Sequence, residues 1–260
     1  FTCDCSSETC TAATSDDPSG TGVSSKVIIH VVADRATLDG TADNAGFIAG
    51  HGVITDTHVR DLAARPDAQI SPIVPRGTAT RPDGTVVLPA HSASDPYRPS
   101  TALDTYVRVR DGYSVIPGNA TSAWNADVDH VREFDHDNPT AGGLTVPDNL
   151  NVKDRRNHLI KTNHDWLDDQ WRDGNGILRQ EFITPEGLVI PGEPENLEAL
   201  FPGLRRIRFE APAQAPPATP PATTPEPDVE PTRSMTRVAA KHARRQEERE
   251  RNRQRRATLD

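Results

Sequence analysis

The stretch VDHVREFDHDNPTAGGLTVPDNLNVKDRRNHLIKTNHDW, residues 128–166, decides the fold. Apolar residues alternate around Val128 and Val131, as they do in a half-buried strand. The glycine pair Gly142-Gly143 marks a reversal of the chain, and a second apolar segment follows it. A polar helix then carries His158. The stretch therefore predicts a strand, a turn, a second strand and a helix within about 40 residues.

Four residues of this stretch have the chemistry that phosphodiester cleavage needs. A histidine that titrates near pH 6.5 can take a proton from water, and His130 is predicted to be this general base. Asn149 is expected to hold it in place through a hydrogen bond. Asp129 and His158 offer a carboxylate and an imidazole to one divalent cation, and such ligands suit Mg²⁺ or Mn²⁺.

The arrangement matches a ββα-metal finger of the HNH (His-Me) type, in which a hairpin and one helix aim a base and a metal at one phosphate. Each residue alone is common, so a coincidence is the alternative interpretation. Residues 97–166 resemble the HNH nuclease module of a large actinobacterial family in which that module follows domain of unknown function 222. The matching positions are Arg110-Asp111, Pro117-Gly118, Asp129-His130-Val131, Thr145, Asn149-Leu150, Arg155, His158, Lys161 and Trp166.

Residues upstream and downstream extend the resemblance to about residues 1–204. The segments 27–40 and 45–63 resemble the end of the preceding domain, so the chain is interpreted as a C-terminal fragment. The resemblance implies a metal-dependent DNA endonuclease with His130 as general base. The alternative is a catalytically inactive DNA-binding or scaffold module that keeps the same fold.

One departure from the family is large. The family frames its finger with a structural zinc ion held by two cysteines, then by a Cys-x-x-His on the helix. None of the corresponding residues is a thiolate or an imidazole, and one carboxylate among neutral groups is a poor zinc site. No structural zinc is therefore expected, and either side-chain packing replaces it or the finger is a decaying copy. The four positions are Ser114, Asn119, Asp154 and Asn157.

The net charge of −9 is divided unevenly along the chain. Residues 233–260 carry ten basic and four acidic residues, so the rest of the chain is strongly acidic, which is unfavourable for binding a polyanion. A local basic cluster lies beside the proposed metal helix and is predicted to contact phosphate, with a solvated helix face as the alternative. It comprises Lys153, Arg155, Arg156 and Lys161.

The 260 residues, with 34% hydrophobic content and 23 prolines, predict a modest α+β core with unstructured segments. No apolar run is long enough to span a membrane, and nothing resembles a secretory leader, so a cytoplasmic protein without a membrane partner is expected. The expected organisation is a domain-222 remnant over 1–92, the HNH finger over 93–172, a β-hairpin extension over 173–210, a proline-rich linker over 211–232, and a basic tail over 233–260 that is helical or disordered.

Local patterns predict further elements. The apolar run 27–33 predicts a buried strand, and Thr55 or Asp56 can cap a helix that reaches residues 62–64. A hairpin is expected around Asp83-Gly84, and a helix over 101–110. The metal helix is expected to run from Asp154 on to Trp171, followed by a hairpin over 177–190. Cys3, Cys5 and Cys10 form an odd, clustered set that is either an incomplete metal knuckle or inert.

Overall fold

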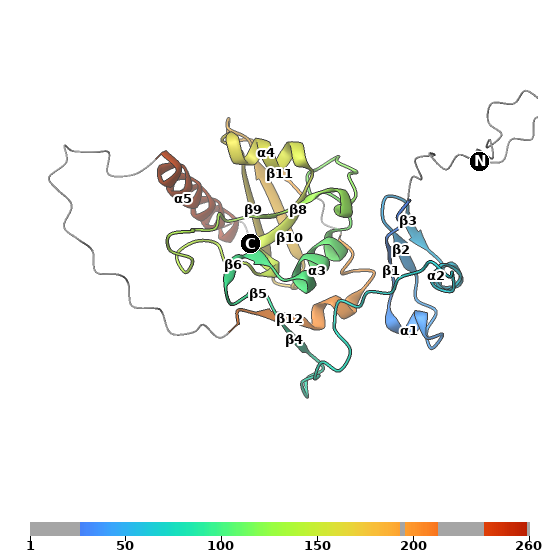
Figure 1. Cartoon of the computed structure of the whole chain (residues 1–260). Coiled ribbons are helices and arrows are strands. Elements are labelled where there is room, and N and C mark those ends of the chain that lie inside the picture. Colours follow the sequence, from blue (N-terminus) through green and yellow to red (C-terminus); the bar gives the residue numbers. More distant parts are fainter. Residues whose placement is uncertain (1–26, 193–195, 213–236, 259–260) are drawn as a thin grey trace, which may run out of the picture.

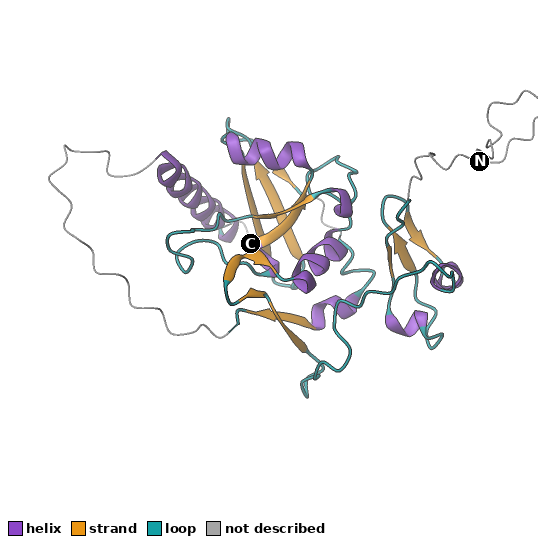
Figure 2. Ribbon diagram, in the orientation of Figure 1, coloured by secondary structure: helices purple, strands orange, loops and turns teal. Residues whose placement is uncertain are grey.

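The computed structural model describes residues 27–192, 196–212 and 237–258. In these residues it shows the expected mixed α+β protein, with five α-helices and several small sheets (Figure 2). The cysteines at positions 3, 5 and 10, and all but the first two residues of the predicted linker, lie outside the described residues.

A small N-terminal unit consists of one antiparallel sheet and two helices (Figure 1). The Thr55 hydroxyl caps the second helix by accepting from the His58 amide, as predicted. The predicted buried strand over 27–33 is wrong, because only two residues of the run pair with the short neighbouring strand and Val27 is 81% exposed. The elements are β1 (Val31–Val32), α1 (Arg35–Leu38), β2 (Gly46–Ile48), β3 (Gly52–Ile54) and α2 (Asp56–Ala63).

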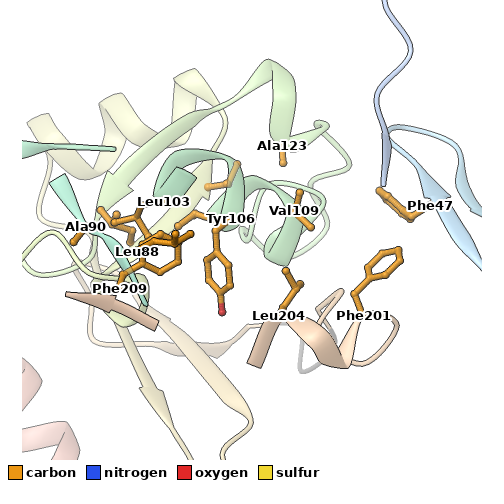
Figure 3. Packing of buried hydrophobic residues seen from close by; sticks show 13 residues of the cluster. Phe47, Leu88, Ala90, Leu103, Tyr106, Val109, Ala123, Phe201, Leu204 and Phe209 are labelled. Atoms are coloured by element: carbon orange, nitrogen blue, oxygen red, sulfur yellow. The ribbon is translucent and has the colours of Figure 1, made fainter. Parts of the chain in front are cut away.

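Helix α3 (Thr101–Asp111) lies at the centre of the hydrophobic core (Figure 3). Ser100 caps its first turn, and Leu103, Tyr106 and Val107 are buried on one face, with the i, i+3, i+4 spacing of an amphipathic helix. The helix ends at Gly112, whose φ of 69° suits glycine. The predicted helix over 101–110 is thus confirmed.

Two short two-stranded sheets lie next to α3, and one of them contributes Leu88 and Phe209 to the core. The predicted turn at Asp83-Gly84 leads into a strand, but that strand makes a single bridge back to Thr80 and pairs instead, in parallel, with a segment far along the chain. The elements are β4 (Val86–Pro89) paired with β12 (Ile207–Glu210), and β5 (His91–Ser92) paired with β6 (Asp95–Pro99). Short 3₁₀ turns lie at Ala123–Asn125, Pro147–Asn149 and Pro202–Arg206.

The predicted order of strand, strand and helix is present in the stretch that decides the fold. Strand β7 (Asp127–His130) pairs antiparallel with β8 (Leu150–Lys153), with His130 opposite Leu150. Helix α4 (Arg155–Asn163) follows directly, with Asp154 as its N-cap.

Helix α4 does not continue to Trp171 as predicted. It ends at Asn163, and residues 167–172 form β9 (Leu167–Arg172), which pairs along its whole length with β10 (Leu178–Ile183). The turn between these two strands contains Asn175-Gly176, and Gly176 has a φ of 74°. Strand β11 (Val189–Pro191) completes the sheet, so the predicted hairpin over 177–190 is confirmed.

Helix α5 (Arg237–Ala257) is the helical form of the basic tail, and it packs beside this sheet (Figure 1). One face of this helix is not exposed to solvent. Its Arg245, Arg249 and Asn252 side chains are buried against the protein.

Candidate active site

Arg110 and Asp111 fix the strand that faces His130. The Arg110 guanidinium is fully buried and donates to the carbonyls of Pro147 (2.7 Å) and Leu150 (2.8 Å). The Asp111 carboxylate pairs with Arg110 and accepts from the Val152 amide at 3.0 Å. The end of α3 therefore holds the beginning of β8 in register.

His130 lies at the end of β7 and is almost completely buried. The Thr145 hydroxyl donates to the Pro96 carbonyl at 2.6 Å, so it accepts from His130 Nε2 at 2.9 Å. This assigns the proton to Nε2 and leaves Nδ1 as a lone pair, which has no hydrogen-bond partner among the described residues. Tyr97 stacks on the ring, with centroids 5.2 Å apart.

Burial lowers the pKa of His130 to about 4, although the Asp129 carboxylate opposes this change. The imidazole is therefore neutral at pH 7, which is the form that can accept a proton. Thr145, which fixes the tautomer, is a residue that the sequence marked only as a family landmark.

Asn149 holds the backbone beyond His130 rather than the ring itself. Its Oδ1 accepts from the Arg132 amide at 2.8 Å, and its Nδ2 donates to the carbonyls of Leu144 (2.9 Å) and Arg132 (3.1 Å). Gly143 leaves room for these bonds, because a Cβ there would lie 2.0 Å from the Arg132 oxygen and 2.6 Å from Asn149 Nδ2. Among the described residues the Asn149 side chain therefore fixes the backbone of Arg132 and Leu144, and its role in positioning the base stays a prediction.

The structure brings Asp129 and His158 together. His158 Nδ1 donates to the Asp127 carboxylate at 2.8 Å, and its Nε2 lies 3.5 Å from Asp129 Oδ1. A carboxylate behind a histidine in this way orients the ring of a metal ligand. Two neighbouring ligands of one small divalent cation, bonded at about 2.1 Å, lie about 3 Å apart, so this spacing fits such an ion.

The other oxygen of Asp129 is already engaged. Asp129 Oδ2 contacts Lys161 Nζ at 2.8 Å and Lys153 Nζ at 3.1 Å, and both ammonium groups also contact Asp168. Burial would raise the pKa of Asp129, but the two lysines override it and hold that pKa far below its usual range. No group of three or more His, Cys, Asp or Glu side chains suited to a metal is found within the described residues.

The four residues of the predicted phosphate-binding cluster separate into two pairs. Arg155 is 70% exposed at the start of α4, where it pairs with Asp127, and Arg156 is exposed beside it. Lys153 is only 1% exposed, and Lys161 is also buried, with its ammonium donating to the His130 and Val131 carbonyls. The two lysines are therefore buried rather than part of a solvated helix face, and the two arginines face solvent.

The four positions that correspond to the family's zinc ligands meet around one carboxylate. Asp154 Oδ2 accepts from Asn119 Nδ2 at 2.7 Å, from Asn157 Nδ2 and, at 3.4 Å, from Ser114 Oγ. Asp154 Oδ1 caps α4 through the amides of Arg156 and Asn157. Residues that are up to 40 positions apart in the sequence are thus joined by hydrogen bonds to one carboxylate.

The basic tail is a neighbour of the site that sequence reasoning missed. Arg249 donates to the Val131 carbonyl directly after His130, and Arg245 donates to the carbonyls of Lys161, His164 and Trp166 at the end of α4. The 245, 249, 252, 256 spacing was visible in the sequence as one helical face. Nothing in the sequence identified its partners.

Comparisons with known proteins agree with part of the resemblance. Residues 1–111 match the family described as Domain of unknown function (DUF222), and the match extends to the end of α3. The chain is 30% identical over 217 residues to the uncharacterized protein Rv3776 of Mycobacterium tuberculosis, and 30% identical over 219 residues to the uncharacterized protein Rv2100 of the same organism.

These alignments cover 75% and 74% of this chain, but only 37% of each relative's length. The chain therefore spans little more than a third of the curated relatives that it matches. No solved structure matches the chain. None of the helices in the described part of the chain is both long and apolar enough to cross a membrane.

Proposed function

We propose that the chain is a metal-dependent endonuclease of the HNH type that hydrolyses DNA phosphodiester bonds in the cytoplasm. The observation that carries the proposal is the orientation of His130. Its ring is neutral at pH 7, its Nε2–H donates to Thr145, and its Nδ1 lone pair has no hydrogen-bond partner among the described residues, while the neighbouring residue Asp129 lies 3.5 Å from His158. The hairpin of β7 and β8 with α4 supports the ββα-metal arrangement.

In the proposed reaction, His130 Nδ1 accepts a proton from a water molecule while the water oxygen forms a bond to phosphorus. The P–O bond to the leaving strand breaks, and the released oxygen takes a proton from solvent. Asp129 Oδ1 and His158 Nε2 would hold Mg²⁺ or Mn²⁺, which supplies positive charge to the scissile phosphate when bound. Arg155 and Arg156 are exposed and suited to phosphates next to the site.

A second candidate is a catalytically inactive DNA-binding or scaffold module. One observation favours it: the Lys153 and Lys161 ammonium groups already balance the negative charge of Asp129 without any metal ion. The two candidates differ in their need for a metal and for His130.

A nicking assay separates them. The full chain should nick supercoiled plasmid with Mg²⁺ or Mn²⁺ but not with EDTA, and His130→Ala should lower the rate roughly 10²–10⁴-fold. His164→Ala is the matched control, because this exposed histidine lies six residues beyond His158 at the end of α4. If no cation supports nicking while DNA is still bound, and His130→Ala binds DNA equally well, the inactive module is the correct description.

A further inference from the structure

The inner face of α5 carries arginines where a docked helix usually carries apolar residues. Arg245, Arg249 and Asn252 are each no more than 5% exposed, and their spacing of four and three residues places them on one side of the helix. The large apolar side chain Val238 is 62% exposed. Hydrogen bonds and ion pairs, rather than apolar burial, therefore hold the described part of this helix against the protein.

Arg249 joins α5 to two other segments through its three side-chain nitrogens. Nη2 donates to the Val131 carbonyl at 2.6 Å, Nη1 to the Glu133 carboxylate at 2.8 Å, and Nε to the Asp168 carbonyl at 2.9 Å. The first two acceptors lie directly after His130, and the third lies on β9. A planar guanidinium can make these bonds at once, whereas a lysine ammonium on a flexible stem cannot reproduce the fork.

Arg245 makes the matching connection to α4. Its Nη1 donates to Glu133 at 2.7 Å, and its Nη2 donates to the carbonyls of His164 (2.8 Å), Trp166 (3.0 Å) and Lys161. Glu133 is thus shared by both arginines. Together they tie the segment after β7 to the end of the helix that carries His158.

We propose that Arg245 and Arg249 are positioning residues for the candidate active site, so that the site is fully formed only when α5 is docked. The proposal rests on the proposed function. Val131 is the residue next to His130, and its carbonyl accepts from both Arg249 and Lys161, while Lys161 also holds Asp129. Removal of the Arg249 guanidinium therefore loosens the backbone at Val131, next to the proposed base His130. It also removes one contact from the network in which Lys161 holds the proposed metal ligand Asp129.

The test compares Arg249→Lys and Arg249→Ala with Arg253→Ala in the full chain. Arg253 is the matched control, because it lies on the same helix, is exposed, and among the described residues pairs only with Glu250. Both Arg249 variants should lower kcat for plasmid nicking roughly 10–100-fold with KM nearly unchanged, since a misplacement of about 1 Å can cost 10²-fold. Arg253→Ala should leave kcat unchanged. A rise in KM in all three variants, with kcat unchanged, would overturn the proposal and identify α5 as a DNA-contacting arm.

Hydrogen exchange supplies a second readout that does not need activity. The amides of Val131 and Arg132 bond to Asn149, so they should exchange faster in both Arg249 variants, while amides inside α3 keep their protection. Unchanged exchange at Val131 and Arg132 would overturn the positioning role. If the wild-type chain does not nick DNA at all, the proposed function fails, and the exchange result still decides whether Arg249 positions this segment.

Discussion

Replacing Asp154 with alanine should destabilise the protein markedly, because one carboxylate serves two elements. Oδ1 caps α4 by accepting from the amides of Arg156 and Asn157, each at 3.1 Å. Oδ2 accepts from the side-chain amides of Asn119 and Asn157, and more weakly from Ser114. The substitution removes the cap and leaves half-buried donors without an acceptor.

The size of the effect follows from these contacts. Loss of an aspartate N-cap costs about 1 kcal/mol. The amides of Asn119 and Asn157 lose their acceptor at about 1 kcal/mol each, and the Ser114 contact at 3.4 Å is too long to add much. The expected loss is therefore about 3 kcal/mol. For a folded unit of about 200 residues this corresponds to a fall in Tm of roughly 6–12 °C.

Urea and thermal unfolding of the full chain measure this loss. Asp137→Ala is the matched control, since Asp137 is exposed and its carboxylate accepts no hydrogen bond from the described residues. A loss below about 1 kcal/mol for Asp154→Ala, which is the contribution of the cap alone, would refute the view that this carboxylate joins the two segments.

Three further predictions follow from the same region. Replacing Asp154 and the three residues bonded to it by the ligands that the family resemblance implies should create a site for one Zn²⁺, visible as metal-dependent thermal stabilisation. The four substitutions are Ser114→Cys, Asn119→Cys, Asp154→Cys and Asn157→His. Burial would raise the pKa of Glu133, but Arg249 overrides it and lowers that pKa to about 2, from an ordinary value of 4.5. This contribution is present above pH 4.5 and is lost as the pH falls toward 2, so the free energy of unfolding should drop by up to about 3 kcal/mol over that window, and by less in Glu133→Gln. Gly143→Ala should cost about 1–3 kcal/mol of unfolding free energy because its Cβ would meet the Arg132 carbonyl, whereas Gly174→Ala has open space and should cost little.

The elements that the sequence predicted well are those set by local signals. The caps at Ser100 and Thr55 fix where α3 and α2 begin. The alternation around Val128 and the polar segment after Asp154 produce the β7, β8 and α4 arrangement. In each case the information lies within a few residues of the element, so no distant partner was needed to recognise it.

The errors come from partners that are distant in sequence. Residues 167–172 resemble the continuation of a helix, but six backbone pairs with β10 decide for a strand. The sequence predicted that Lys153 is a basic surface residue, but it is buried. Both faces of β8 are covered, and the carboxylates of Asp129 and Asp168 supply the counter-charges. The buried face of α5 is held by Glu133, which pairs with Arg249 although it lies 116 residues earlier in the sequence. No local sequence pattern predicts such a pair.

The division of the Asp129 carboxylate reconciles the two candidate functions. Oδ2 is held by two buried ammonium groups, which keep the carboxyl ionised and fix its rotation, whereas the only side chain that contacts Oδ1 in the described part of the chain is His158. The two lysines and the carboxylates of Asp129 and Asp168 carry no net charge as a set, so a divalent cation on Oδ1 would give this part of the site the positive charge that a phosphate requires. In that case Lys153 and Lys161 would orient Asp129 as a metal ligand. They would compete with the metal ion only if Oδ1 as well as Oδ2 contacted them. Mn²⁺ binding to the full chain should therefore be abolished by Asp129→Ala and strongly weakened by His158→Ala, measured by calorimetry. Equal Mn²⁺ affinity in Asp129→Ala and the wild type would mean that Oδ1 does not hold the cation, and would leave the inactive module as the better description.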